Sequence, residues 1–413
     1  MERIHVAIIG GGASGLMLAN ALAETEYFTS PTAKTVVFER ADRVGKKLSA
    51  TGNGQGNITN QHALTEEQGY FTMDKTAEKQ AYDILRAHAP KEMERFWLRR
   101  GVSIAYDERG RAYPSGRQAS ALTDALRFYA SEKGIELRAG AWVKELKKEG
   151  KGFLLRYEKE GESQTCYADK VVLCTGGKAA KNFGTDGSAY ALAQSFGHTV
   201  TALYPSLVQL KTDTSHTKTL KGIRVMDGGL TAHTPSGEYT LQGDIIFTDY
   251  GVSGDAVFRM SAFITSEIPT GKVTLSIDFL PNTAKETIYE LLQEKRAIYP
   301  DLDKNELLFG IVNNQVGRAV LRRANGELRT AAKLVKAFPL TVTGNLDFDY
   351  AQVTKGGIPL TETDETLQSR LVKGLYLAGE ILDVDGQCGG FNLQWAYSSA
   401  QTIANALKNG GQA

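Results

Sequence analysis

The sequence predicts an α/β fold in which a parallel sheet flanked by helices is interrupted by an inserted β unit and a helical unit. Three observations lead to this prediction. The chain starts with an apolar strand, a glycine turn and a helix within residues 4–22. Two later strands of the buried, parallel type, residues 170–174 and 374–378, end in small residues. From about residue 200 the pattern changes to short strands separated by turn residues, and then to helical spacing.

The first motif is the glycine turn itself. Residues 4–9 are apolar enough for a strand buried on both faces, and residues 16–22 contain helix formers without a breaker. Of the six residues between them, Gly10 allows a tight turn, Gly12 lets a pyrophosphate approach the backbone, and Gly15 lets the helix pack closely on the strand. The free N–H groups and the dipole at the helix N-terminus favour an anion. This order of elements predicts a dinucleotide site.

An acidic residue follows the second strand of this unit. Residues 35–38 are Thr-Val-Val-Phe, and Glu39 comes directly after them. An acid at this place in a dinucleotide-binding unit bonds a ribose hydroxyl. The alternative is a glycine-rich turn in an α/β domain that binds no nucleotide. The strand, the helix and Glu39 together favour the dinucleotide.

Composition excludes several classes of protein. The 413 residues suggest two or three domains, and 48 Lys and Arg against 47 Asp and Glu leave no net field that would attract nucleic acid or an anionic membrane. Cys166, Cys174 and Cys388 are far apart, which argues against a disulfide framework or a zinc site. The chain has no run of about 20 apolar residues, and its first apolar run leads into the glycine turn rather than a secretion signal. We expect a cytoplasmic protein without nucleic-acid or membrane partners; no oligomeric state follows from these patterns.

The change of pattern along the chain predicts its domains. Residues 1–199 and 354–413 are expected to form the nucleotide domain, because both contain parallel-type strands that end in Gly-rich turns. Residues 200–280 and 336–353 are expected to form the inserted β unit, and residues 281–335 the helical unit.

Two further segments are rich in glycine and small polar residues. Residues 51–60 have no strand before them and no Gly-Lys-Ser/Thr after them, so they predict a loop whose amides press against a flat polar ring or, alternatively, a solvent-exposed Asn/Gly turn. Near the C-terminus, Gly389 and Gly390 open the last helix shortly after a strand that ends in Gly379-Glu380. This second glycine-led helix N-terminus is also expected to face an anionic group.

Together, these motifs resemble the two-part FAD sites of glutathione-reductase-like flavoproteins. The finer motifs are similar to those of the YhiN/BaiN-type, aminoacetone-oxidase-like family of FAD-binding proteins, and they cover almost the whole chain. They are Lys46-Lys47-Leu48 with the 51–60 loop, residues 184–188 (Gly-Thr-Asp-Gly-Ser), residues 247–254, residues 354–357 (Thr-Lys-Gly-Gly), residues 379–386 and residues 389–394. The resemblance implies a Rossmann-like FAD domain, an inserted β-barrel-like domain and a small helical domain, with FAD bound non-covalently.

The resemblance also implies a set of FAD-binding residues on both halves of the chain. The pyrophosphate is expected at Gly10, Gly12, Ala13, Ser14 and Gly15, and the adenosine half at Glu39, Arg40, Val143, Thr175, Gly176 and Gly177. The ribityl and pyrophosphate part is expected at Gly379, Glu380 and Asp383, and the flavin ring near Lys47, Thr51, Gly52, Asn53 and Asn57. Gly390, Phe391, Asn392 and Leu393 are expected to present amides to the pyrimidine edge of the ring.

The chain departs from the family pattern in two places. Residues 53–57 read Asn-Gly-Gln-Gly-Asn where many members have Gly-Gly-Gly-Arg-Cys-Asn, so a basic group and a thiol are missing. Asp249 and Asp255 stand where many members have His and Pro. Both places are expected to face substrate, so the resemblance implies FAD binding but not a particular substrate.

No side chain is assigned as a catalytic acid, base or nucleophile. His5, His198, His216 and His233 are interpreted as core or surface histidines, with His198 a favourable partner for a helix C-terminus. Cys388 lies close to the expected flavin edge, where a redox thiol is the alternative to a structural one. Because a flavin performs the redox chemistry, the protein has to supply position and electrostatics. Asn392→Ala or a bulky residue at Gly390 is therefore expected to lower the flavin potential.

The expected activity is that of an FAD-dependent oxidoreductase acting on a small organic substrate. The chain has no second strand–Gly-x-Gly-x-x-Gly–helix unit, so NAD(P)H is expected only as a transient electron donor. The resemblance implies either NAD(P)H-linked reduction of an enone-like or steroid-like compound or oxidation of an amine by oxygen. The alternative from another class is a flavoprotein with a role in RNA modification or a structural role.

Overall fold

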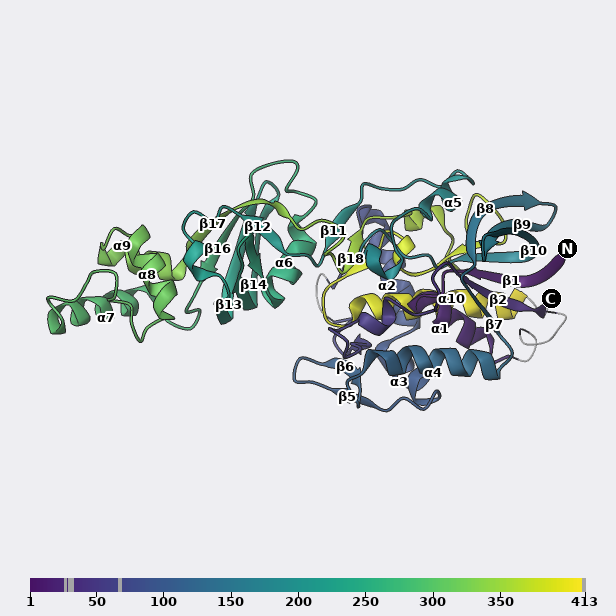
Figure 1. Cartoon of the computed structure of the whole chain (residues 1–413), viewed down its shortest axis with the longest axis horizontal. Helices are drawn as coiled ribbons and strands as arrows, with labels where there is room; N and C mark the ends of the chain where they lie inside the picture. Colours follow the sequence, from purple (N-terminus) through teal and green to yellow (C-terminus); the bar gives the residue numbers. More distant parts are fainter. Residues whose placement is uncertain (26–27, 29–32, 66–68, 411–413) are drawn as a thin grey trace. The chain divides into compact units, whose positions relative to one another are not determined.

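The computed structural model describes residues 1–25, 28, 33–65 and 69–410 and divides into two compact units (Figure 1). Unit 1 contains Met1–Tyr204 and Val353–Ala413, and unit 2 contains Pro205–Gln352. The chain passes between the units at β11 (Tyr204–Ser206) and immediately before β18 (Val353–Lys355). The N-terminal and C-terminal parts of the sequence therefore form one unit.

Unit 1 contains a seven-stranded sheet. Most of its strands are labelled together near the N-terminus in Figure 1. Its order is β7 (Glu136–Ala139), β2 (Thr35–Glu39), β1 (Glu2–Ile9), β10 (Glu162–Leu173), β9 (Gly152–Lys159) and β8 (Trp142–Glu149), and β19 (Leu375–Leu377) pairs with β10. Strands β7, β2, β1, β10 and β19 run parallel, whereas β8 and β9 are antiparallel. The predicted α/β fold with a parallel sheet is confirmed.

Strand β10 is longer than the sequence pattern predicts. Residues 164–167 and 170–174 read as separate strands, but β10 runs without a break from Glu162 to Leu173. The whole length of β1 pairs with it, while its first half also pairs with β9 and its end with β19. Asp169, between the two predicted segments, receives hydrogen bonds from Arg3 and lies 3.2 Å from His5 Nδ1.

Unit 1 also contains six helices in its described part. They are α1 (Ala13–Leu22), α2 (Glu78–Ala87), α3 (Pro90–Leu98), α4 (Ala119–Glu132), the short α5 (Tyr190–Gln194) and α10 (Phe391–Gly410). Of these helices, α1, α4 and α5 contact the seven-stranded sheet. Nine of the ten residues of α1 are buried, because it packs against both α10 and α4. After α5, the buried His198 places Nδ1 2.6 Å from Glu362 Oε2 and Nε2 2.8 Å from Ser369 Oγ. His198 therefore links the segment after α5 to the segments that carry Glu362 and Ser369.

Unit 2 contains a closed antiparallel barrel. Its order is β12 (Leu210–Thr212), β15 (Gly251–Ser253), β14 (Gly237–Phe247), β13 (Arg224–Thr234), β16 (Thr274–Asp278) and β17 (Phe338–Asn345). Alternate residues such as Leu230, Ile245 and Ile277 are fully buried, as a barrel interior requires. The remaining helices are α6 (Asp255–Ile264), α7 (Lys285–Ile298), α8 (Asn314–Arg323) and α9 (Leu328–Lys336). The barrel confirms the expected architecture; the separation of residues 281–335 as a domain stays a prediction.

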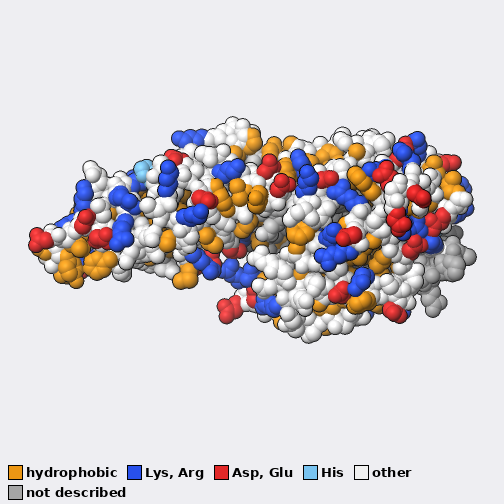
Figure 2. Space-filling model, in the orientation of Figure 1, with side chains coloured by type: hydrophobic (Ala, Val, Ile, Leu, Met, Phe, Trp, Pro, Cys, Tyr) orange, Lys and Arg blue, Asp and Glu red, His pale blue; other side chains and the backbone are white. Residues whose placement is uncertain are grey.

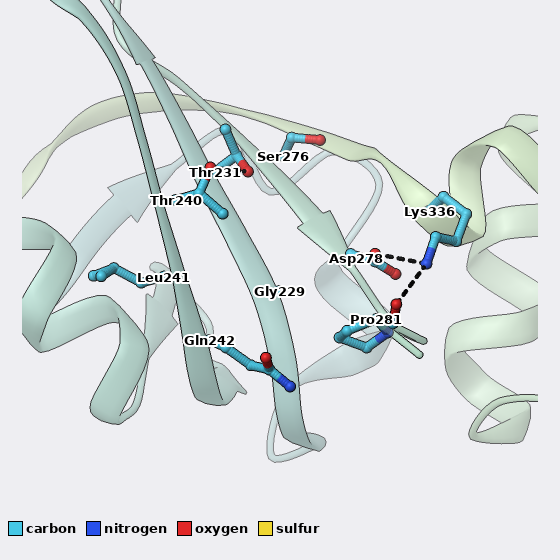
Figure 3. Close-up of a pocket in the computed structure, with 9 residues that line it drawn as sticks. All are labelled: Gly229, Thr231, Thr240, Leu241, Gln242, Ser276, Asp278, Pro281 and Lys336. Carbon is cyan, nitrogen blue, oxygen red and sulfur yellow. Dashed lines mark hydrogen bonds and ion pairs between the residues drawn. The ribbon is translucent and has the colours of Figure 1, made fainter. Parts of the chain in front are cut away.

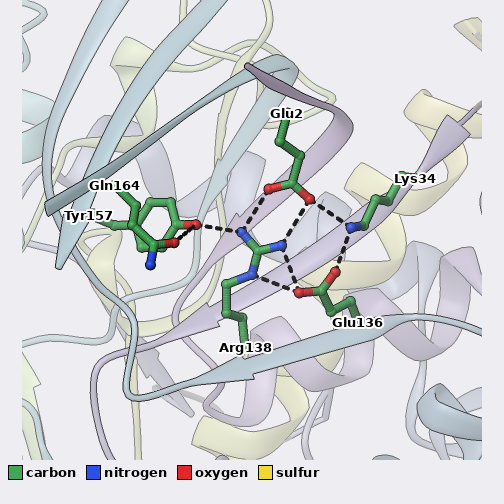
Figure 4. A network of polar contacts seen from close by, with 6 residues as sticks. All are labelled: Glu2, Lys34, Glu136, Arg138, Tyr157 and Gln164. Atoms are coloured by element: carbon green, nitrogen blue, oxygen red, sulfur yellow. Dashed lines mark hydrogen bonds and ion pairs between the residues drawn. The ribbon is translucent and has the colours of Figure 1, made fainter. Parts of the chain in front are cut away.

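A charged network ties the start of β1 to β7 (Figure 4). The Arg138 guanidinium donates to Glu2 at 3.0 Å and to the Tyr157 hydroxyl at 2.9 Å, and Tyr157 in turn donates to Gln164. Lys34 Nζ lies 2.7 Å from Glu2 Oε1 and also contacts Glu136. The hydrogen bond from Arg138, with that from Lys34, lowers the pKa of Glu2 to about 2.

Glu2→Gln is expected to lower the free energy of unfolding at pH 7 by about 1 kcal/mol, a modest value because the side chain is one-third exposed. The folded-state pKa lies below the unfolded one, so Glu2 stabilises the fold above pH 4.5 and this contribution disappears as the pH falls toward 2. Urea unfolding of both proteins between pH 7 and pH 2 measures it. Glu290→Gln on α7 is the control, since Glu290 has no ion pair among the described residues. An equal difference between Glu2→Gln and the wild type at pH 7 and pH 2 would contradict this account.

Candidate functional site

The carboxyl ends of four parallel strands meet at one edge of the unit 1 sheet. They deliver Gly10 after β1, Glu39 at the end of β2, Thr175 shortly after β10 and Gly379 shortly after β19. In open α/β sheets, ligands bind outside this edge. Residues predicted from both halves of the sequence therefore come together in one unit.

The glycine turn has the geometry that a dinucleotide motif needs. Gly10 has a φ of +106°, and a Cβ placed on it would lie 2.3 Å from the Cys174 carbonyl oxygen. A Cβ on Gly15 would lie 2.0 Å from the Gly10 oxygen. A Cβ on Gly12 meets nothing within 4 Å, so open space lies beside the first residue of α1. Together with Ala13 and Ser14, this turn leaves room for a group to approach the helix N-terminus.

Glu39 is held in place by the backbone around it. Its Oε2 accepts from Gly11 N at 2.9 Å and its Oε1 from Ala41 N at 2.7 Å. Burial raises the pKa of Glu39, and these N–H donors oppose the rise. Because each carboxylate oxygen can accept a second hydrogen bond, the group can still receive a ribose hydroxyl. The buried Val143 lies on β8, which contacts β2.

The motif at residues 184–188 supports the residue after Glu39. Arg40 Nη1 donates to Asp186 Oδ2 and to Ser188 Oγ, each at 3.1 Å, and Arg40 also binds the Gly184 carbonyl. Burial would raise the pKa of Asp186, but the bonds from Ser188 and Arg40 lower it to about 2. Arg40 is thus fixed beside the end of β2.

Three segments converge after β10. Lys47 Nζ lies 2.8 Å from Glu380 Oε2, and Thr354 N donates to Glu380 Oε1 at 3.0 Å. A Cβ on Gly177 would lie 2.4 Å from Thr354 Oγ1, and the buried Thr175 hydroxyl has no partner within the described ranges. Gly176 has a positive φ, which lets the chain turn at this point. Residues from the two halves of the sequence thus form one cluster.

Asp383 links the closing segment to the middle of unit 1. Its carboxylate accepts from Met73 N, at 3.1 Å and 3.0 Å for its two oxygens, and Oδ2 also accepts from Asp74 N. Burial raises the pKa of Asp383. The buried Tyr190 hydroxyl has no partner in the part of the chain that the structure describes, and burial, with the charges of Glu380 and Asp383, raises the pKa of Tyr190.

The start of α10 is packed tightly against β3 (Thr59–Asn60). Gly390 has a φ of +101°, and a Cβ there would lie 2.4 Å from the Thr59 oxygen. Asn392 Oδ1 accepts from Gly386 N at 2.9 Å while its Nδ2 donates to the Gly386 oxygen at 2.7 Å. This side chain therefore closes the preceding loop. The backbone amides of Phe391, Asn392 and Leu393 lie at the start of the helix.

The 51–60 loop divides into an exposed part and a buried part. Gly52 and Asn53 are exposed and Thr51 is half-buried. Asn57 is buried, and its side chain donates to the carbonyls of Thr59 and Ala112. The buried end of the loop lies against α10, since the Thr59 hydroxyl donates to Gln394 Oε1 at 2.6 Å. FAD contact by these residues stays a prediction.

The structure adds residues that the sequence motifs missed. Thr354, Tyr190 and Tyr70 line the same region, and the Tyr70 ring lies 5.6 Å from that of Phe391. The hydroxyls of Thr175, Tyr190 and Tyr70 are all buried without a partner among the described residues. Buried polar groups of this kind are rare unless a ligand or water satisfies them. These hydroxyls and the open space at Gly12 fit a bound dinucleotide such as FAD. No single tyrosine in the sequence carried a signal for this role.

The described residues give little evidence for a reactive thiol, a metal site or a membrane span. None of the three cysteines forms a disulfide, and burial raises the pKa of Cys166 and of Cys174 to about 12. No cluster of His, Cys, Asp and Glu suitable for a metal ion is found there. His233, which the sequence left without a partner, pairs with Glu238 at 2.8 Å. Within the described chain, no helix is both long and apolar enough to cross a membrane.

A separate hollow of about 430 Å³ lies on the barrel of unit 2 (Figure 3). Lys336 Nζ lies 2.8 Å from Asp278 Oδ2 and donates to the Leu280 carbonyl at 2.6 Å, so it joins the end of α9 to the segment after β16. The lining residues are Gly229, Thr231, Thr240, Leu241, Gln242, Ser276, Asp278, Pro281 and Lys336. None of the predicted FAD-binding residues belongs to it.

The chain is similar over nearly its whole length to proteins of known activity. The chain is 34% identical to the 3-dehydro-bile acid delta(4,6)-reductase of Clostridium scindens over 97% of this chain and 98% of that protein. It is 27% identical to the ribosomal RNA dihydrouridine synthase of Escherichia coli, over 98% of both chains. A crystal structure of 3-ketosteroid delta1-dehydrogenase from Sterolibacterium denitrificans covers 99% of this chain and all of that one with a TM-score of 0.53 and 14% identity, which shows a shared fold.

A family model described as the HI0933-like protein Rossmann domain matches residues 4–406. This match confirms the family resemblance given by the motifs at both ends of the chain. With the reductase relative, it assigns the chain to the FAD-dependent oxidoreductases. The chain belongs to the HI0933-like Rossmann-domain family.

Proposed function

We propose that this protein is an FAD-dependent reductase of a carbon–carbon double bond conjugated with a carbonyl group, in a small enone-like or steroid-like substrate, with NAD(P)H as the transient electron donor. The observation that carries the proposal is the 34% identity to a 3-dehydro-bile acid delta(4,6)-reductase over nearly the whole of both chains. The name of that relative describes double bonds in conjugation with a 3-keto group. Within this chain, the sheet edge and the two helix N-termini described above support the binding of FAD.

The residues of unit 1 would position such a cofactor and tune it. When bound, FAD supplies hydride transfer to a polarised double bond. The amides at Gly12 to Ser14 and the N-terminus of α1 would hold its pyrophosphate. Glu39 would accept from the adenosine ribose, and the N-terminus of α10 would favour negative charge at the pyrimidine edge.

An anaerobic titration tests this assignment. Adding NADPH and then NADH to the yellow protein is expected to bleach the flavin absorbance band, and a 4-ene-3-ketosteroid is then expected to restore it. If neither nicotinamide bleaches the band, the nicotinamide-linked reductase is excluded. Oxygen consumption with a panel of amines would then test the amine oxidase instead.

A second candidate function rests on the relatives that are ribosomal RNA dihydrouridine synthases. Dihydrouridine formation also saturates a double bond conjugated with a carbonyl, so one site chemistry serves both substrate classes. Charge favours the small molecule, because Lys and Arg nearly balance Asp and Glu and the two signs are interspersed on the face shown in Figure 2. Filter binding of ribosomal RNA over a salt series separates the two; submicromolar, salt-sensitive affinity would favour RNA.

We also propose a cytoplasmic location, because a reducing compartment suits three cysteines that form no disulfide.

A further inference from the structure

We propose that Tyr113 is the acid that delivers a proton to the substrate double bond. This inference rests on the proposed reductase function, and it goes further by naming a residue for a step that none of the FAD-binding motifs accounts for. It depends on where Tyr113 lies, on its free hydroxyl and on the cations beside its ring.

Tyr113 lies next to the start of α10, where the flavin edge is expected. It belongs to β6 (Arg111–Pro114), which pairs with β3 on one side and β5 (Ile104–Tyr106) on the other. Strand β3 touches the helix start, because Asn60 Nδ2 donates to the Gly389 oxygen at 3.2 Å. Arg111 Cδ lies 3.5 Å from where a Cβ of Gly389 would be. The hydroxyl of Tyr113 is near enough to the Cys388 thiol for their charges to interact.

The hydroxyl of Tyr113 has no hydrogen-bond partner in the part of the chain that the structure describes. The ring is largely buried, with the residue 6% exposed, but the hydroxyl oxygen is not fully enclosed by the chain. Tyr106 in the same small sheet differs, because its hydroxyl donates to Glu94. A hydroxyl without a partner on a largely buried ring keeps its proton available to a bound molecule. The helix N-terminus and this hydroxyl are independent features that converge on one place.

Two guanidinium groups flank the ring and favour loss of its proton. Arg117 Cζ lies 4.0 Å from the ring centroid and Arg111 Cζ 5.9 Å from it. Burial raises the pKa of Tyr113, and the charges of Arg111 and Arg117 oppose this rise. Asp107, which pairs with Arg111 at 2.7 Å, and Cys388 act in the opposite direction to the arginines. The phenolate that remains after proton transfer is thus stabilised by positive charge.

The step balances as a two-electron reduction. A hydride from a reduced dihydroflavin adds to the carbon β to the carbonyl, and the π electron pair of the double bond moves toward the α-carbon. A new C–H bond forms there with the proton of the Tyr113 hydroxyl, whose O–H bond breaks. Water then reprotonates the phenolate. The substrate gains two hydrogens and two electrons, and the flavin is oxidised.

Tyr113→Phe removes the acid and keeps the ring between its arginines. The flavoprotein is reduced anaerobically with dithionite and mixed with a 4-ene-3-ketosteroid, and the return of the flavin band is followed from pH 7 to pH 11. We expect reoxidation to be about 100-fold slower in the variant. Because the pKa of Tyr113 is raised, we expect the wild-type rate to fall only above pH 10, and this fall to be absent in the variant. Reduction by NADPH is expected to keep its rate. Tyr106→Phe in the same small sheet is the matched control, because its hydroxyl already donates to the half-buried Glu94.

A binding measurement complements these rates. Calorimetry with the saturated 3-ketosteroid and the oxidised protein is expected to give an about 5-fold weaker Kd for Tyr113→Phe, since one hydrogen bond to the ligand is lost. If Tyr113→Phe has the reoxidation rate, the pH profile and the Kd of the wild type, the role of Tyr113 is wrong while the proposed function still stands. If the ketosteroid does not reoxidise the reduced wild-type protein either, the proposed function and this inference fail together.

Discussion

Gly12→Ala is expected to weaken FAD binding about 100-fold, or roughly 2.7 kcal/mol, while the protein keeps its fold. Gly12 precedes α1 with a φ of −82°, a value open to any residue, and its new methyl group meets no atom of the chain within 4 Å. The methyl group would instead occupy the space through which a pyrophosphate approaches the helix N-terminus. Titration of the deflavinated protein with FAD, followed by flavin fluorescence, gives the affinity.

The neighbouring glycine shows why this position gives the sharper test. Gly10→Ala combines a positive φ with a contact of 2.3 Å to the Cys174 oxygen, so loss of FAD there could follow from loss of the fold. For Gly12→Ala, urea unfolding of the apoprotein should agree with the wild type within about 1 kcal/mol. Gly116→Ala, another position with open space, is the control and should bind FAD normally. Wild-type affinity in Gly12→Ala would contradict the placement of the pyrophosphate.

Asn392→Ala is expected to lower the flavin midpoint potential by about 20–40 mV, which corresponds to roughly 1–2 kcal/mol for two electrons. The structure changes the reason for this prediction. The Asn392 side chain is engaged with both the N–H and the carbonyl of Gly386, so it fixes the loop that leads into α10. Without it, the amides at the helix start lose their alignment and stabilise the reduced, anionic ring less well.

The potential is measured by photoreduction with reference dyes. Asn282→Ala, an exposed substitution in unit 2, is the control and should leave the potential unchanged. FAD affinity is measured beside the potential, because a looser loop should also weaken binding. An unchanged potential in Asn392→Ala would exclude the helix start as the group that tunes the flavin.

Local patterns in the sequence were enough to predict the nucleotide half of the site. The turn at Gly10 to Gly15 and the acid at Glu39 depend on residues close together in the chain, and strand, turn and helix formed as predicted. Parallel strands buried on both faces have near-continuous apolar sequences, so the apolar parts of β1 and β10 could be predicted as strands. The same reasoning divided β10 into an arm of a hairpin and a parallel-type strand, because a local pattern does not show that β1 pairs with residues of both.

The sequence by itself determined the parallel sheet, the glycine turn, Glu39 and the second glycine-led helix start, because each is specified by neighbouring residues. Only the tertiary structure decided which distant groups meet. Lys47 pairs with Glu380 across 333 positions, and Asp383 reaches Met73 across 310. Tyr113 has no motif around it; its place beside α10 depends on the pairing of β6 with β3. Such contacts depend on how strands and helices pack, and a linear pattern carries no information on a hydroxyl that packing leaves without a partner.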